Sequence, residues 1–174
     1  MLKVLAAASD KFGKSFSKLP SGKGYGLVCT NYLGTYVVTM AEVTVNRQNG
    51  QIKVERVVCA QDTGEMINPE GIRMQIESCI TMGLGYCMTE EIRFQGGRVL
   101  DENFDTYEIP RFSWLPKIEP VLVDNPEMAP QGCGEPSITS MGAVIANAVY
   151  DAIGVRQFTL PMTPSRIKAT LLTS

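Results

Sequence analysis

Apolar residues at the N-terminus recur at helical spacing as far as Asp10. The glycines and Pro20 that follow cannot continue a helix, so residues 1–23 are predicted to form a short helix and then a loop. The residues on the apolar side of this helix are Leu2, Val4, Leu5 and Ala8.

Residues 24–47 are rich in β-branched and aromatic side chains, and Val43 and Val45 alternate with polar neighbours. This pattern predicts strand structure. The dipeptide Asn49-Gly50 separates two such runs and is typical of a type I′ turn, which requires positive φ at both central positions. We therefore expect a β-hairpin around residues 49–50.

A long helix is predicted to begin at Asn68, because asparagine caps helix N-termini and Pro69 would occupy the first helical position. Its apolar side contains small residues, which suits close packing against a sheet. Two glycines within it weaken the helix locally. The residues on that side are Ile72, Ile76, Cys79, Ile80, Gly83, Leu84 and Cys87.

A second hairpin is predicted around Gly96-Gly97, followed by an irregular connection with two prolines at residues 103–116. An apolar run follows at residues 118–124. The clearest helix ends at Gly154 and buries Met141, Val144, Ile145, Ala148, Val149 and Ile153. Strands and helices do not alternate regularly, so the predicted fold class is α+β, with a mostly antiparallel sheet packed against two longer helices. No repeat or linker divides residues 1–174.

The composition is that of one ordinary globular domain of 174 residues, with 44% hydrophobic residues and a formal net charge of -2. The basic residues do not cluster, so nucleic acid is not an expected partner. The first apolar run is too short for a secretory signal or a membrane span, so the cytoplasm is the default compartment, and the periplasm is left open as an alternative.

The absence of histidine excludes Ser-His-Asp and Cys-His nucleophiles and most catalytic zinc sites. Five cysteines are an odd number, are widely spaced and contain no C-x-x-C pair. We expect them to be small buried side chains without disulfides, as in a reducing compartment. Acid-base chemistry must then use carboxylate, lysine, tyrosine or cysteine side chains.

The segment 130–137, PQGCGEPS, is the strongest candidate for a functional site. Its two glycines allow the backbone to approach a ligand, and their N–H groups can point together at an anion or an oxo group. Glu135 follows directly, and Pro136 fixes the chain at the start of the last helix, as a general base requires. The same residues are also consistent with an ordinary loop that has an acidic residue near a helix N-terminus.

Two further positions have both a functional and a structural interpretation. Gln75 lies on the long helix and is locally an ordinary helix residue. Asp62-Thr63-Gly64 lies at the end of a predicted strand. An Asx-type turn accounts for this tripeptide as well as a functional site does.

Taken together, six segments resemble the molybdenum-binding large subunit of the xanthine dehydrogenase and aldehyde oxidase family, and most nearly its isoquinoline 1-oxidoreductase beta-subunit branch. They occur in that family's order and approximate spacing, and the resemblance runs from about Val4 to the C-terminus. The segments are AEVTVNRQNGQIKVERVVCAQDTGEMINPEGIRMQIES (41–78), GLGYCMTEEIRF (83–94), NFDTYEIPRF (103–112), QGCGEPS (131–137), AVIANAVYDAIGVR (143–156) and LPMTPSRI (160–167).

The resemblance implies a site. Glu135 would be the general base beside molybdenum, Gln75 would help to bind the pyranopterin cofactor, and Gly132, Cys133 and Gly134 would lie beside the metal centre. The implied cofactor is molybdenum-pyranopterin in its cytosine dinucleotide form. The implied reaction hydroxylates a small N-heteroaromatic compound or aldehyde with water as the oxygen source, and electrons leave through an iron–sulfur subunit.

Large subunits of that family are several times longer, and their glycine-rich and arginine-bearing loops have no match here. We therefore expect one C-terminal cofactor-binding piece spanning 1–174, inactive and without cofactor unless the remainder of the large subunit is present. Two alternatives stay open: a non-catalytic fragment that docks on a partner or self-associates as a homo-oligomer, and an unrelated small α+β binding protein.

Overall fold

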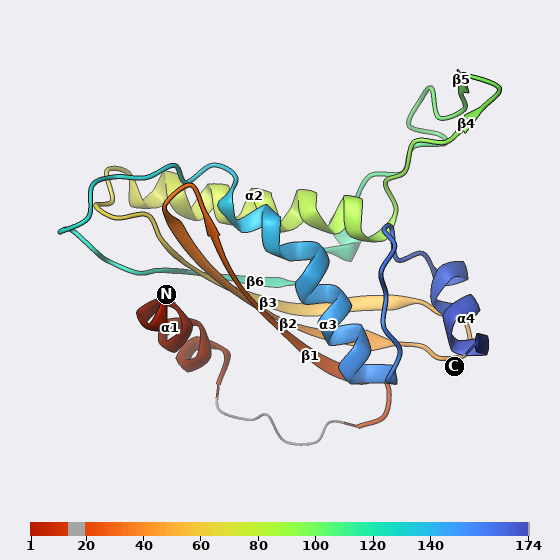
Figure 1. Ribbon diagram of the computed structural model, residues 1–174, viewed down its shortest axis with the longest axis horizontal. Coiled ribbons are helices and arrows are strands. Elements are labelled where there is room, and N and C mark those ends of the chain that lie inside the picture. Colours follow the sequence, from red (N-terminus) through yellow and green to blue (C-terminus); the bar gives the residue numbers. More distant parts are fainter. Residues whose placement is uncertain (14–19, 174) are drawn as a thin grey trace.

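A computed structural model describes residues 1–13 and 20–173 (Figure 1). The helices are α1 (Leu2–Phe12), α2 (Pro69–Met88), α3 (Met141–Ile153) and α4 (Pro164–Thr173), with short 3-10 turns η1 (Phe112–Trp114) and η2 (Pro136–Ser140). The strands are β1 (Lys23–Tyr32), β2 (Thr35–Val45), β3 (Ile52–Asp62), β4 (Phe94–Gln95), β5 (Arg98–Val99) and β6 (Lys117–Leu122).

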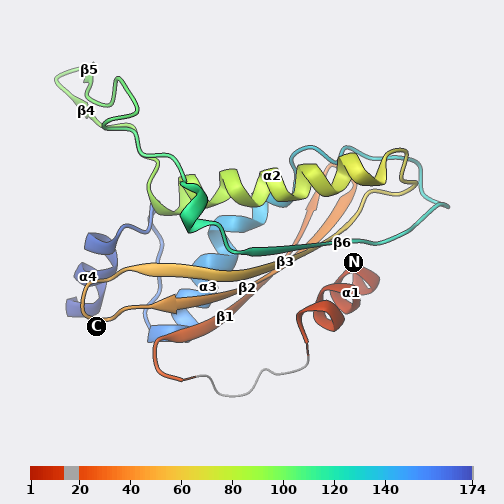
Figure 2. The same ribbon diagram turned by 180° about the vertical axis from the view of Figure 1, so that it is seen from behind.

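The main sheet has the order β1-β2-β3-β6. Its first two pairings are antiparallel, and β6 runs parallel to β3. Figure 2 shows how α2 crosses back over the sheet between β3 and β6, which is the connection that a parallel pair requires. The α+β class with a mostly antiparallel sheet is confirmed.

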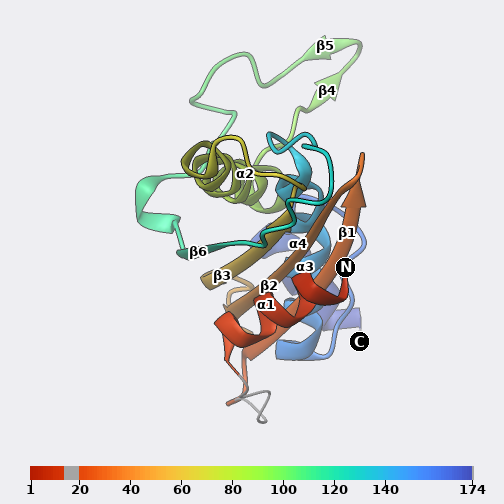
Figure 3. The ribbon, with the colours of Figure 1, turned by 90° about the vertical axis from the view of Figure 1, so that its left-hand side faces the viewer.

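Helices cover both faces of this sheet, so β2 is buried on both sides (Figure 3). Val38 and Met40 pack with α1 in one apolar cluster, whereas Val37 and Ala41 belong to the cluster beneath α2 and α3. Side chains alternate between the two faces of a strand, and a strand buried on both faces therefore reads as a continuous apolar run.

A β-bulge shifts the side-chain pattern along β3. Glu42 pairs with Arg56 while Val43 pairs with Val54, so Glu55 is one extra residue on β3. The residues facing α2 and α3 are therefore even-numbered before the bulge, at Ile52 and Val54, and odd-numbered after it, at Val57, Cys59 and Gln61. The bulge thus aims Gln61 at the helices.

The strand-forming run 24–47 is divided by a tight turn at Leu33-Gly34, where φ is 49° and 91°. Positive φ at both central positions is the type I′ geometry that the sequence predicts at Asn49-Gly50. A hairpin does form there, but the predicted turn type is wrong. The side chain of Asn46 instead accepts hydrogen bonds from the backbone of residues 48 and 49, which makes a longer loop that Gly50 closes with φ 77°.

The two long helices follow the sequence prediction. Asn68 accepts a 2.9 Å hydrogen bond from the backbone of Gly71 as an N-cap, and Gly154 ends α3 in the left-handed conformation. All the apolar residues predicted for α2 and α3 are buried. The hairpin at Gly96-Gly97 is also confirmed, and it projects from the body of the domain (Figure 1).

The N-terminal helix is held by Arg56 of β3. Its guanidinium donates to the carbonyl oxygens of Phe12 and Lys11, stacks over the Phe12 ring and forms an ion pair with Glu119 of β6. These contacts satisfy carbonyl groups at the C-terminal end of α1 that have no partner within the helix. Part of the predicted loop, residues 14–19, lies outside the described residues.

All five cysteines are free, as predicted, but not all are buried. Cys59, Cys79 and Cys87 are buried, whereas Cys29 is exposed because it lies on the edge strand β1, beyond the cover of α1, and Cys133 is half-buried in a loop. In the part of the chain that the structure describes, no helix is both long and apolar enough to cross a bilayer.

Candidate functional site

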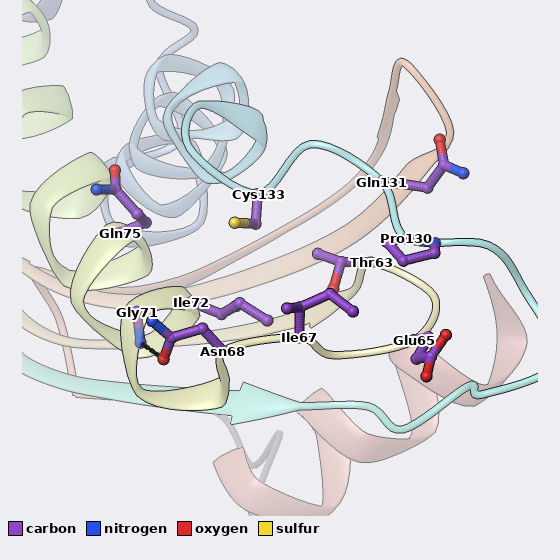
Figure 4. Close-up of a pocket in the computed structure, with 10 residues that line it drawn as sticks. All are labelled: Thr63, Glu65, Ile67, Asn68, Gly71, Ile72, Gln75, Pro130, Gln131 and Cys133. Atoms are coloured by element: carbon purple, nitrogen blue, oxygen red, sulfur yellow. Dashed lines mark hydrogen bonds between the residues drawn. The ribbon is translucent and has the colours of Figure 1, made fainter.

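A cavity of about 270 Å³ lies between the first turns of α2 and the loop that precedes η2 (Figure 4). Thr63, which directly follows β3, is part of its lining. Its lining residues are Thr63, Glu65, Ile67, Asn68, Gly71, Ile72, Gln75, Pro130, Gln131 and Cys133. Two of the predicted cofactor-binding residues, Gln75 and Cys133, are thus brought together at one cavity.

The first turns of α2 form one wall of this cavity. The buried side chain of Ile72 anchors the helix to the core, which leaves Gln75 exposed at the cavity rim. The Gln75 side-chain oxygen lies 3.9 Å from the position that a Cβ atom would occupy at Gly134. The helix and the glycine-rich loop are therefore in contact at the residues predicted to bind cofactor.

Three successive carbonyl groups of the loop accept hydrogen bonds from side chains of three different elements. Thr35 of β2 donates to the Gly132 oxygen at 2.7 Å, and Gln61 of β3 donates to the Cys133 oxygen at 3.5 Å. Cys79 of α2 donates to the Gly134 oxygen at 3.1 Å. The loop backbone is held on the sheet and the helix at each of these residues.

The N–H groups of the same loop have no such partners. Within residues 1–13 and 20–173, the backbone nitrogens of residues 132–135 donate no hydrogen bond. Gly132, Gly134 and Glu135 are exposed, and nothing lies within 4 Å of a Cβ built on Gly132. A row of N–H groups without partners in an exposed loop favours an oxygen-rich or anionic ligand.

A buried polar cluster lies beneath the loop. The Ser137 hydroxyl donates to the Gln61 side-chain oxygen at 2.5 Å and accepts from the Cys59 thiol at 3.2 Å, and Thr39 pairs with Ser140 at 2.7 Å. Each of these side chains is at most 1% exposed. Because unpaired polar groups are costly to bury, this network fixes where η2 begins and therefore where Glu135 is placed.

This buried polar cluster was not predicted from the sequence. Gln61 and Thr39 interrupt apolar strands at positions that point toward the core, and that interruption was the available signal. A polar residue on the buried side of a strand needs a partner, but the sequence does not show that Ser137 and Ser140 supply it from 76 and 101 residues away.

Glu135 is the N-cap residue of η2, and its backbone oxygen accepts a 3.1 Å hydrogen bond from the backbone of Ile138. Its carboxylate is exposed, accepts no hydrogen bond within the described part of the chain, and is not among the groups that line the cavity. It lies close to Cys79: burial is the main cause that raises the pKa of the Cys79 thiol, and the Glu135 charge adds to it. The predicted base therefore lies beside the cavity, held by its backbone and open to a ligand from outside.

Asp62-Thr63-Gly64 is a structural turn. Asp62 accepts from the backbone of Gly64 at 3.0 Å, as an Asx turn does, and from the side chain of Asn125 at 3.1 Å. The Thr63 carbonyl accepts from Gln131, so this turn supports the start of the loop. No group of three histidine, cysteine or acidic side chains in the described residues is arranged to hold a metal ion by itself.

The sequence pattern of the molybdopterin cofactor-binding domain matches residues 7–116, more than half of the chain. The chain belongs to the molybdopterin cofactor-binding domain family. This excludes an unrelated small α+β binding protein. The six matching segments predicted a place among the molybdenum-binding subunits of the xanthine dehydrogenase and aldehyde oxidase family, and this prediction is confirmed.

Individual proteins with similar sequences support this family membership. A nicotinate dehydrogenase polypeptide from Pseudomonas putida is 36% identical over 132 residues, which cover 76% of this chain and 11% of that protein. The isoquinoline 1-oxidoreductase beta chain from Brevundimonas diminuta is 32% identical over 165 residues, covering 95% of this chain and 21% of that protein. The chain spans about a tenth to a fifth of the length of these relatives.

Quinoline 2-oxidoreductase from Pseudomonas putida 86 has a similar solved structure. It superimposes with a TM-score of 0.74 and 26% identity, covering 79% of this chain and 19% of that one. The α+β arrangement of sheet and helices is therefore shared with part of that enzyme.

The residues present at the cavity fit part of such a cofactor. Oxo, phosphate and pterin groups accept hydrogen bonds, and the free N–H groups of residues 132–135 and the exposed Gln75 amide can donate them. The open space over Gly132 allows close approach of the backbone. The cavity is nevertheless smaller than the roughly 300–1,000 Å³ that ligand sites usually enclose, so it accommodates a portion of the cofactor.

Proposed function

We propose that this chain forms the glutamate-bearing wall of the cofactor and substrate site in a molybdenum hydroxylase. The substrate would be a small N-heteroaromatic compound or an aldehyde, with water as the oxygen source. Relatives named for nicotinate and isoquinoline oxidation support the heteroaromatic class. When bound, the molybdenum-pyranopterin group, in its cytosine dinucleotide form, would supply the two-electron oxidation.

Glu135 is the proposed general base, whose carboxylate oxygen would take the proton from the attacking water-derived oxygen. A base works when its carboxylate is held within hydrogen-bonding reach of the proton that it removes. The observation that carries the proposal is the anchoring of the three carbonyls before Glu135 by Thr35, Gln61 and Cys79. That anchoring holds the exposed Glu135 at a fixed place while leaving the adjacent N–H groups available.

The cofactor-binding role is assigned to Gln75 through its amide and to Gly132, Cys133 and Gly134 through their N–H groups. These residues cover one side of the cofactor. The remainder of the large subunit would supply the other side, and an iron–sulfur subunit would receive the electrons. We propose that the chain alone is inactive, because a one-sided site leaves most of a large cofactor in water. The cytoplasm is the proposed compartment.

The direct test is Glu135→Gln in the complete enzyme, assembled with the remaining polypeptides. The amide keeps the shape but cannot accept the proton, so kcat should fall at least about a hundredfold, with molybdenum content unchanged. Glu77→Gln is the matched control, because Glu77 is an exposed acid on α2 that does not line the cavity. Unchanged turnover in the Glu135 variant would refute the role of Glu135 as base.

A second candidate function, docking on a partner, is favoured by one observation. Phe94 lies on β4 of the hairpin that projects from the body (Figure 1), Phe104 lies in the segment that follows this hairpin, and Phe112 begins η1. These three rings are 67%, 77% and 94% exposed. In the isolated chain these rings should drive self-association into a homo-oligomer. Light scattering at high concentration should show it, and replacing the three rings with serine should remove it; a monomer at every concentration would contradict this candidate.

A further inference from the structure

Cys79 lies one helical turn beyond Gln75 on α2, and its side chain is directed at the glycine-rich loop. Its thiol donates a 3.1 Å hydrogen bond to the carbonyl oxygen of Gly134, and the residue is 4% exposed. Residues four apart on a helix lie on the same face. One face of α2 therefore presents Gln75 to the cavity and Cys79 to the loop backbone.

The accepting oxygen belongs to the peptide group that joins Gly134 to Glu135. A peptide group is planar, so fixing its carbonyl also fixes the direction of the Glu135 N–H and the position of the Glu135 Cα. Gly134 has no side chain to restrict this plane by itself. On the other side, Pro136 is buried and begins η2. Glu135 is thus held between a thiol on α2 and the first residue of a helical turn.

The thiol remains a donor across the range where the enzyme would work. Burial raises its pKa above the ordinary value of 9.0, and backbone hydrogen bonds from Ile138 and Ser137 only partly oppose this. A protonated thiol has one hydrogen to give, and the Gly134 oxygen receives it.

We propose that Cys79 is a positioning residue for Glu135, which it holds through the Gly134 carbonyl. Cys79 itself contacts neither substrate nor cofactor in this arrangement. The inference rests on the proposed function for its catalytic consequence, but the structural effect on the loop does not depend on that function.

The structural effect can be measured on the 174-residue chain by ¹⁵N relaxation. The Glu135 amide should have an order parameter of about 0.85 in the native chain and below about 0.6 in Cys79→Ala. Cys79→Ser, which keeps a donor, should restore most of the order. Cys87→Ala is the control, because Cys87 is a buried cysteine two turns further along α2 whose thiol interacts with Tyr86. If the alanine variant does not fold, Cys79→Val fills the space without a donor.

The catalytic effect is measured in the complete enzyme. Cys79→Ala should lower kcat by on the order of ten- to a hundredfold, because small displacements of a catalytic group are costly. KM and molybdenum content should stay within about twofold of native, since the groups that bind the cofactor are retained. Cys79→Ser should have a kcat within about threefold of the native value, because serine keeps a hydrogen-bond donor at this position with somewhat different geometry.

The outcomes separate this inference from the proposed function. An unchanged order parameter for Glu135 in Cys79→Ala, or an equal loss in Cys87→Ala, would overturn the positioning role whatever the enzyme does. A mobile Glu135 in Cys79→Ala with normal turnover, together with normal turnover in Glu135→Gln, would overturn the catalytic role of Glu135 instead. Loss of both order and kcat, with rescue by serine, supports both.

Discussion

The Gln75 side-chain oxygen on α2 lies 3.9 Å from the place where a Cβ atom would stand at Gly134. These two residues are 59 positions apart in the sequence, and their approach brings a side-chain amide beside an exposed glycine. The pair defines the edge of the cavity to which we assign cofactor binding.

Replacing Gln75 with leucine keeps the volume of the side chain and removes its hydrogen-bonding groups. We expect the complete enzyme to retain molybdenum about tenfold less strongly, because one lost hydrogen bond to a charged or polar group is worth about 1.5 kcal/mol. Metal analysis after dialysis measures this loss. Met74→Leu is the control, since Met74 is exposed and does not line the cavity; equal molybdenum in both variants would contradict the assignment.

The packing of α3 on β1 depends on glycine. A Cβ atom at Gly26 would overlap the carbonyl oxygen of Val144, and one at Gly24 would overlap the backbone of Ala148. Gly26→Ala should therefore lower the free energy of unfolding by about 3 kcal/mol, as overpacking against fixed backbone does. Urea unfolding of the chain measures this, and Gly132→Ala, with nothing within 4 Å of its Cβ, should change stability little.

The turn between β1 and β2 contains local strain. Leu33 has φ 49° and is 79% exposed, so a bulky residue adopts the left-handed conformation without burying its side chain. Asparagine tolerates this conformation better, and Leu33→Asn should raise the free energy of unfolding by about 1 kcal/mol. Thermal unfolding provides the measurement. A lower stability for Leu33→Asn than for the native chain would show that Leu33 makes a stabilising contact.

Alkaline pH should destabilise the fold. Burial raises the pKa of the Cys87 thiol from 9.0 to about 12 and also raises the pKa values of Tyr86 and Cys79. These groups lose protons in the unfolded chain before they do so in the folded one, so their contribution to the free energy of unfolding should be fully present below pH 9.0 and be lost as the pH rises toward about 12.

Urea unfolding at several pH values tests this dependence. Cys87→Ala removes one of the groups, and its stability should fall less steeply with pH than that of the native chain. Parallel curves for the two proteins would mean that Cys87 does not contribute to the alkaline loss.

Local signals in the sequence predicted much of the fold. The caps at Asn68 and Gly154 and the spacing of apolar residues located both long helices because these features depend on neighbours in the chain. The turn at Asn49-Gly50 was predicted in the right place with the wrong geometry. The Asn46 side chain accepts hydrogen bonds from the loop backbone that a two-residue turn would not need.

The site itself was only partly predictable. The glycine-rich loop and Glu135 could be identified from their sequence motif. The side chains that hold them, Thr35, Gln61 and Cys79, come from three other elements. The strand order and the bulge in β3 determine which distant polar residues come into contact. Neither feature can be predicted from the local sequence pattern. The parallel pairing of β6 with β3 was missed for the same reason.

Metal and pterin analysis of the purified 174-residue chain, alone and combined with the remaining segments of a large subunit, shows most directly whether this chain forms one wall of a cofactor site. We expect molybdenum and pterin in about equal amounts in the combined sample and little in the chain alone, because one wall encloses too little of the cofactor. Molybdenum in neither sample would refute the assignment and leave the chain a structural member of its family.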